Sequence, residues 1–256
     1  VLFPGPVSYA FTSPAAGEFV RGVALEAERA GYTLQLIGTP PSGPDGASRP
    51  PLPVATASVD GFVIQCFVDD DPMLQTALAR ALPTVMVDRR PVEGAPWVTV
   101  DDEGGARAAA EHLIELGHRR LGVISMELDL APRDAIVDAV RQAQAAYAPS
   151  RSRLAGYRAA VAAAGLDWDR DVVVYECADD DPSDGRRAAA ALLDRRPRPT
   201  ALLAMSDQLA LGALAHARDA GLPVPERLSV VGFDDAPGAA SARPPLTTVH
   251  QSHVEK

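Results

Sequence analysis

The sequence is poor in the residues that mark disulfide-stapled, membrane-spanning and nucleic-acid-binding proteins. Its 256 residues include two cysteines, a single lysine and only 5% aromatic residues. Cys66 and Cys177 lie in or beside apolar segments without metal-ligand spacing, which predicts small core side chains in a reducing compartment. No basic leader precedes the apolar start at Val1, and no apolar run is long enough to cross a bilayer. We therefore expect a cytoplasmic protein with no membrane partner.

Positive charge is also scarce. The formal net charge is -10 and the isoelectric point is near 4.9. An acidic surface repels phosphate backbones. We therefore do not expect these residues to bind nucleic acid by themselves.

Recognisable catalytic and cofactor motifs are missing as well. The sequence has no G-x-S-x-G elbow, no G-x-x-x-x-G-K-[ST] phosphate loop and no G-x-G-x-x-G dinucleotide fingerprint. His250 and His253 could in principle join Asp234 and Asp235 as mixed metal ligands. In an extended segment, however, the two imidazoles would face opposite sides, which disfavours a shared metal ion. The sequence predicts no cofactor, no metal and no enzyme, with an enzyme built on the adjacent carboxylates Asp234 and Asp235 as an open alternative.

Apolar strands alternate with helices along the whole chain. Ser13 and Pro14 are typical of a helix start, and Gly31 of a helix end. Continuous apolar strands separated by helices indicate parallel sheets covered on both faces. The Pro- and Gly-rich stretch 39–58 predicts a loop in place of a helix. We expect strands at 1–4, 33–37, 61–65, 84–88, 97–100, 121–125, 172–176, 201–205 and 228–233, and helices at 14–30, 71–81, 103–116, 153–164, 183–195 and 207–220.

The pattern restarts near residue 101, which predicts two doubly wound parallel-sheet lobes. In open parallel sheets the ligand lies beyond the carboxyl ends of the strands. Asp88 ends a strand in the first lobe and Asp234 follows one in the second, so we expect a ligand cleft between the lobes. By side-chain alternation Asp234 faces this cleft, whereas Asp235 braces the following loop.

Two more polar residues are candidates for this cleft. The acidic runs 69–71 and 179–181 each precede a proline and a helix, where carboxylates cap the helix. The second run also follows a strand, and we assign its Asp180 to the ligand. Arg153 opens a helix at the edge of the second lobe, where its guanidinium offers a fork of donors to a hydroxyl or carboxylate. A solvated surface arginine is the alternative that composition alone favours.

Six stretches, taken together and in order, resemble the effector-binding core of the lactose-repressor (LacI/GalR) family of bacterial transcription regulators. They are VDGFVI (59–64), PTVMVD (83–88), 98–125, SRLAGYRAAVAAAGL (152–166), 199–235 with its end SVVGFDD, and PPLTTVHQ (244–251). The resemblance implies a type I periplasmic-binding-protein-like fold, with lobes at 1–100 plus 252–256 and at 101–251. It also implies a small effector, such as a sugar, held between the lobes. A helix-turn-helix headpiece before these residues would bind operator DNA as part of a homodimer, with contacts from the helix 207–220 (Leu211, Leu214, Ala215) and the loop 236–243.

The resemblance also implies the residues that hold the effector. It places Asp88, Arg153 and Asp234 at positions that bond effector hydroxyls or ring heteroatoms. Further wall positions are Phe11, Ser13, Pro14, Ser206, Gln251 and His253. Ser206 stands where the family often has Asn, and His253 where sugar repressors commonly have an aromatic residue. The segment 126–151 is longer than in the best-known relatives, and its A-I-V-x-A-V spacing predicts an added helix.

An allosteric repressor-type sensor is the function that this pattern favours. An effector bonded to Asp88, Arg153 and Asp234 would favour closed lobes, and the chain crossings near 100–101 and 248–251 would transmit the closure to the headpiece. A periplasmic or lipid-anchored sugar-binding protein of an ABC transporter is the alternative with the same fold. The G-F-D-D and P-P-L-T-T-V-H-Q signatures are more typical of the regulators.

Overall fold

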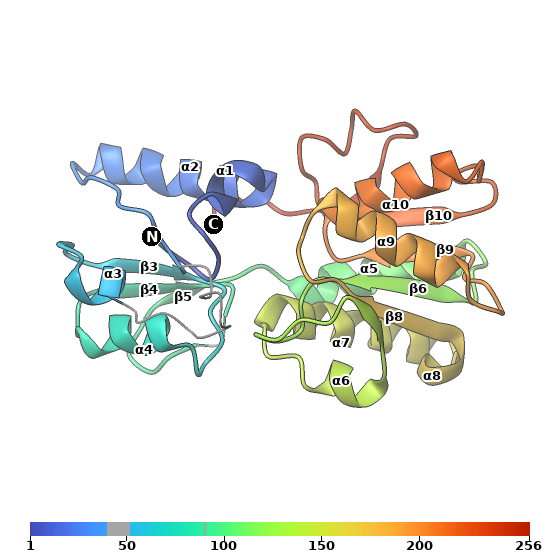
Figure 1. Ribbon diagram of the computed structural model, residues 1–256, viewed down its shortest axis with the longest axis horizontal. Coiled ribbons are helices and arrows are strands. Elements are labelled where there is room, and N and C mark those ends of the chain that lie inside the picture. Colours follow the sequence, from blue (N-terminus) through green and yellow to red (C-terminus); the bar gives the residue numbers. More distant parts are fainter. Residues whose placement is uncertain (40–51, 90) are drawn as a thin grey trace. The chain divides into compact units, whose positions relative to one another are not determined.

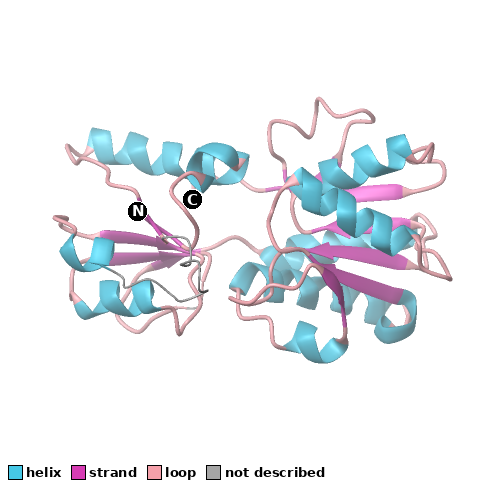
Figure 2. Ribbon diagram, in the orientation of Figure 1, coloured by secondary structure: helices cyan, strands magenta, loops and turns pink. Residues whose placement is uncertain are grey.

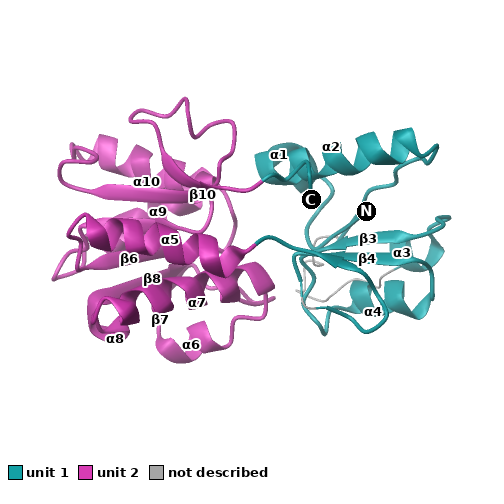
Figure 3. Cartoon of the chain, turned by 180° about the vertical axis from the view of Figure 1, so that it is seen from behind, with its two compact units in different colours: residues 1–100, 252–256 teal, residues 101–251 magenta. Residues whose placement is uncertain are grey.

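A computed structural model describes residues 1–39, 52–89 and 91–256. These residues form two compact units, Val1–Val100 with Ser252–Lys256 and Asp101–Gln251 (Figure 3). Each unit packs helices against a sheet, which confirms the α/β fold class (Figure 2). Most of the predicted loop 39–58 lies outside the described residues. Its described end contains a short helix, α3 (Leu52–Thr56), where a loop was predicted.

The first unit is a parallel sheet with helices on both faces. Its strand order is β2-β1-β3-β4-β5, and every pairing is parallel. Helices α2 and α4 lie on opposite faces of the sheet (Figure 1), each over its own apolar cluster. The strands are β1 (Leu2–Phe3), β2 (Ile37–Gly38), β3 (Phe62–Gln65), β4 (Thr84–Val87) and β5 (Trp97–Val98), and the other helices are α1 (Tyr9–Thr12), α2 (Pro14–Arg29) and α4 (Pro72–Ala79).

Local chemistry sets the boundaries of α2 as predicted. The Ser13 side chain accepts a hydrogen bond from the backbone N–H of Ala16 at 3.4 Å, and Pro14 occupies the first helical position. Gly31 follows the helix with φ of +77°, a conformation that favours glycine. The predicted strand 33–37 is wrong except at its end, because the pairing with β1 begins at Ile37 and residues 33–36 are not in a strand.

The second unit is a six-stranded sheet with the order β11-β10-β9-β6-β8-β7. All pairings are parallel except that of the edge strand β7 with β8. Helices α5 and α7 cover one apolar cluster, and α9 and α10 cover the other (Figure 1). The strands are β6 (Leu121–Ser125), β7 (Ala135–Val137), β8 (Val172–Glu176), β9 (Ala201–Ala204), β10 (Ser229–Asp234) and β11 (Thr247–His250); the helices are α5 (Asp102–Glu115), α6 (Ala139–Ala143), α7 (Ala148–Ala163), α8 (Trp168–Asp171), α9 (Pro182–Leu193) and α10 (Asp207–Asp219).

The segment 126–151 contains an added helix, as predicted, but this helix and the one that follows begin at other residues than predicted. Residues 135–137 form the antiparallel edge strand β7, which pairs with β8, so the predicted added helix is confined to α6. Helix α7 begins at Ala148 with Pro149 in its first turn, where a missing N–H costs nothing. Arg153 therefore lies inside α7 and does not begin it.

Candidate functional site

Strained backbone marks the carboxyl ends of the strands in both units. Among the residues that the structure describes, five non-glycine residues have positive φ. Cys66 (57°) follows β3, Asp88 (50°) follows β4, and Asp234 (118°) and Asp235 (56°) close β10, leaving only Ala81 elsewhere. Left-handed conformations at non-glycine residues are costly and cluster at ligand sites. The edges predicted to face a ligand are therefore those where the backbone is strained.

In the second unit, a buried guanidinium organises this edge. Arg153 Nε donates to Oδ1 of Asp102 at 2.8 Å, and Nη1 donates to the backbone oxygen of Met205. Nη1 also lies 3.9 Å from Oδ1 of Asp234, and the guanidinium stacks on the Phe233 ring at 3.6 Å from its centroid. Burial lowers the pKa of Arg153, but the carboxylates of Asp102 and Asp234 outweigh burial and raise that pKa. The arginine is a fixed charge in the core edge and not a solvated surface side chain.

Asp234 is the last residue of β10 and is 7% exposed. The side-chain amide of Gln251 donates to Oδ1 of Asp234, and the Gln251 backbone N–H approaches the Asp234 carbonyl oxygen at 3.4 Å. Gln251 follows β11, which pairs with β10. The structure thus brings together Arg153, Asp234 and Gln251, three of the predicted site residues, at the carboxyl ends of neighbouring strands.

Asp180 and Ser206 form a second pair at the same edge. The Ser206 hydroxyl donates to Oδ1 of Asp180 and also accepts from the backbone N–H of Leu209 at 3.1 Å, so that it caps α10. Burial raises the pKa of Asp180 to about 7, and the nearby Asp234 carboxylate adds to this effect. Burial and the neighbouring carboxylate therefore make the charged form of Asp180 less favourable than that of an aspartate in water.

The two adjacent acids of the G-F-D-D stretch have different surroundings. Asp235 is exposed, and its Oδ2 lies 2.9 Å from Nδ1 of His250. The following loop is braced by Asp207 instead, which corrects the role predicted for Asp235. Asp207 accepts from the backbone N–H of Ala236 at 2.7 Å and from Oγ1 of Thr248 at 2.6 Å. Burial raises the pKa of Asp207 to about 6.

In the first unit, Asp88 is buried against a lysine. Lys256 Nζ donates to Oδ2 of Asp88 at 2.7 Å, and both side chains are less than 10% exposed. Thr99 Oγ1 approaches the other carboxylate oxygen at 3.5 Å. A ligand hydroxyl that bonds to Asp88 would therefore bond to a carboxylate whose orientation is already fixed by the Lys256 ammonium group.

The other predicted residues of the first unit lie around α1 and α2. Phe11 on α1 is 76% exposed, whereas Ser13 is 5% exposed and uses its hydroxyl to cap α2, beside Pro14. His253 belongs to the returning segment Ser252–Lys256 and is half-buried. Its ring is close enough to Glu18 of α2 to lower the pKa of that carboxyl, after the larger effect of Arg21.

Sequence reasoning missed the partners that hold these side chains. Asp102 and Lys256 were not singled out, although each is the counter-ion of a predicted residue. A second missed pair is the buried ion pair of Arg141 with Glu176. The Glu176 carboxylate accepts from Arg141 Nε at 2.8 Å and from Arg141 Nη2 at 2.6 Å. The single lysine of a sequence rich in arginine was the one available signal for Lys256.

Over residues 1–39, 52–89 and 91–256, no group of three or more histidine, cysteine or carboxylate residues could hold a metal ion. No helix in the same ranges is both long and apolar enough to span a bilayer.

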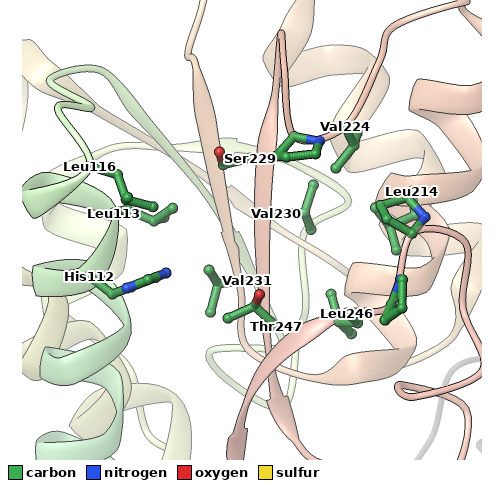
Figure 4. A pocket seen from close by; sticks show the side chains of 13 residues that line it. His112, Leu113, Leu116, Leu214, Val224, Ser229, Val230, Val231, Leu246 and Thr247 are labelled. Atoms are coloured by element: carbon green, nitrogen blue, oxygen red, sulfur yellow. The ribbon is translucent and has the colours of Figure 1, made fainter.

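A separate apolar cavity of about 360 Å³ lies at the opposite end of the second sheet (Figure 4). It is lined by the end of α5, the start of β10 and the segment before β11, including Leu116, Ser229 and Leu246. Because strands begin at this edge, the cavity is distinct from the polar cluster around Asp234.

Comparisons with known proteins match this chain to a periplasmic binding protein-like domain and to transcriptional regulators. Residues 110–255 match the family described as periplasmic binding protein-like domain. An HTH-type transcriptional regulator of Mycobacterium tuberculosis is 40% identical over 98% of this chain and 69% of its own length. A LacI-family transcriptional regulator of Corynebacterium glutamicum superposes with a TM-score of 0.87 at 32% identity, over 99% of this chain and 74% of that one. The transcriptional regulator CelR, solved as a cellobiose complex, gives a TM-score of 0.79 at 30% identity, over 99% and 72%.

Proposed function

This chain belongs to the LacI family of transcriptional regulators, as the core that binds the effector, and from that premise we propose that it senses a sugar and thereby controls operator affinity. Members of the family bind effectors and DNA and are not enzymes. The adjacent acids Asp234 and Asp235 fit this assignment, since one is buried beside Arg153 and the other is exposed beside His250.

The observation that carries the proposal is the cluster at the carboxyl ends of β9 and β10. Asp234, Gln251, Ser206 and Asp180 supply carboxylate, amide and hydroxyl groups within one edge of the sheet, anchored by the Arg153 guanidinium. A sugar hydroxyl both donates and accepts, so a set of mixed donors and acceptors suits it better than a set of one kind. CelR, a relative at 30% identity, was solved with cellobiose, which supports the sugar assignment.

The proposed switch requires a difference in affinity between two states of the protein. Asp88 in the first unit and Asp234 in the second are both buried and strained in the backbone. We propose that one effector is bonded by both carboxylates, so that it favours the state in which both bonds are made. Each carboxylate already has a protein partner, Lys256 for Asp88 and Gln251 for Asp234, so the ligand shifts the equilibrium only by the additional bonds that it makes in that state.

The remaining parts of the proposal concern partners. We propose a homodimer that acts as a repressor in the cytoplasm and contacts operator DNA through a helix-turn-helix headpiece, because palindromic operators mirror a two-fold protein. The helix α10 and the loop 236–243 are the proposed dimer contacts. The transport-protein alternative is less well supported, since the relatives named above are transcriptional regulators.

A thermal-shift screen tests the proposed effector class. Cellobiose, glucose, ribose and inositol are matched against nucleosides and amino acids at millimolar concentration. A ligand that binds the folded state raises the melting temperature, by an amount that grows with concentration. We expect at least one sugar to do so. A response confined to nucleosides or amino acids contradicts the sugar assignment while leaving the family intact.

A further inference from the structure

The segment 126–151 places Glu127 at the edge of the sheet that carries Asp180 and Asp234. Glu127 lies two residues beyond β6, whose neighbours in the sheet are β8 and β9. Its side chain is half-buried, yet it is surrounded by protein closely enough for burial to raise its pKa, with Asp179 and Glu176 adding to the effect. A side chain that is surrounded by protein but still partly exposed is typical of the lining of a concave surface.

The position of Glu127 is fixed from both sides. Its carbonyl oxygen accepts from the Ser150 hydroxyl at 2.9 Å, and the next backbone N–H, of Leu128, donates to Glu176 at 3.0 Å. Leu128 is fully buried, and its carbonyl oxygen accepts from the backbone N–H of Ala146 at 2.7 Å. The segment therefore holds Glu127 in place as part of the fold and not as a loose loop.

The charges beside Glu127 are unequal. The second unit, all of whose residues the structure describes, has two buried arginines. Arg141 makes a bidentate ion pair with Glu176, and Arg153 pairs with Asp102. Both cations are thus already matched by a carboxylate. Glu127 raises the pKa of Asp180, and Asp179 and Glu176 raise the pKa of Glu127, as like charges do. An anionic ligand would add a further like charge to this edge.

We propose that Glu127 is an effector ligand in addition to the residues above, and that with Asp180 it selects an uncharged or cationic polyhydroxyl compound over an anionic one. The inference rests on the proposed function, because it names the chemical class that the same site accepts. Hydroxyl and ammonium groups donate to both carboxylates, while a phosphate or carboxylate group offers only acceptors at neutral pH.

Matched sugars test the selection. Thermal shift and titration calorimetry on the chain compare glucose, glucosamine, gluconate and glucose 6-phosphate. We expect glucose or glucosamine to bind about a hundredfold more tightly than the two anions, because like charges at a binding site cost several kcal/mol. Glu127→Gln should weaken the best of these probes about tenfold, since a charge-assisted hydrogen bond is replaced by a neutral one. Glu115→Gln, an exposed glutamate at the far end of α5, is the control and should change nothing. An anion that binds as tightly as its neutral parent overturns the proposal.

A second measurement needs no ligand and separates this inference from the sugar assignment. If none of the four probes binds, the sugar assignment loses support, and the melting temperature of the free variants decides the role of Glu127. We expect Glu127→Gln to raise the melting temperature at pH 8, because burial and the carboxylates of Asp179 and Glu176 disfavour the charged form of Glu127, and we expect the gain to shrink at pH 5. A residue that serves the fold alone would lose stability on substitution. A lower melting temperature at pH 8 therefore refutes the proposal.

Discussion

Replacing Arg153 with methionine tests whether this guanidinium is the fixed centre of the cluster. The substitution keeps much of the side-chain volume but leaves Asp102, which is 5% exposed, without its ion-pair partner. Removing one partner of a buried ion pair typically costs about 3–5 kcal/mol. At roughly 2–4 °C per kcal/mol for a chain of this size, the melting temperature should fall by roughly 6–20 °C.

Urea unfolding followed by tryptophan fluorescence measures this loss, because the second unit contains one tryptophan, Trp168. The control is Arg186→Met, whose ion pair with Asp219 is about half exposed and should contribute less than about 1 kcal/mol. Adding Asp102→Asn to Arg153→Met removes the orphaned charge and should restore part of the stability. A single variant Arg153→Met that loses less than about 1 kcal/mol would refute the reasoning.

Three further substitutions probe the edges of the second sheet. Asp180→Asn should stabilise the free protein at pH 8 by up to about 4 kcal/mol, because the pKa of Asp180 is raised to about 7 in the folded protein. The cost of holding the charged carboxylate in the folded state grows as pH rises from 4 through 7, so the difference in unfolding free energy from wild type should vanish near pH 4. A difference that does not depend on pH would contradict this. Asp207→Ala should lower the free energy of unfolding in urea by about 2–4 kcal/mol, because the Ala236 N–H and the Thr248 hydroxyl lose their acceptor. No change in stability would show that water replaces the carboxylate. Gly185→Ala should cost about 1–3 kcal/mol despite the helix preference of alanine, because the added Cβ would overlap the carbonyl oxygen of Leu209; higher thermal stability would mean that α9 can move away from α10.

Much of the framework was predictable because local chemistry and tertiary packing agree there. Ser13, Pro14 and Gly31 bound α2 as their backbone preferences require, and strands β6 and β8 have the predicted bounds. Strands β6 and β8 are covered by helices on both faces, so the apolar pattern alone specifies them. The position of Asp234 at the end of a buried strand was predictable for the same reason.

The remainder depends on contacts between residues far apart in the sequence. Arg153 is separated from Asp102 by 51 residues, and Lys256 from Asp88 by 168, so no local pattern announces either pair. The stretch 135–140 has helical spacing, but β8 offers its free edge and draws residues 135–137 into a strand. Tertiary hydrogen bonds outweigh local preference in such a short segment.

Titration calorimetry into the wild-type chain and two neighbouring variants, with the sugar that gives the largest thermal shift, tests the central claim most directly. Asp234→Asn and Asp235→Asn make the same chemical change one residue apart, in a buried and an exposed carboxylate. The proposed site predicts that Asp234→Asn weakens binding by about tenfold or more, while Asp235→Asn leaves the affinity within about twofold of wild type. Equal losses in both variants, or a larger loss in Asp235→Asn, would contradict the assignment of Asp234 to the effector.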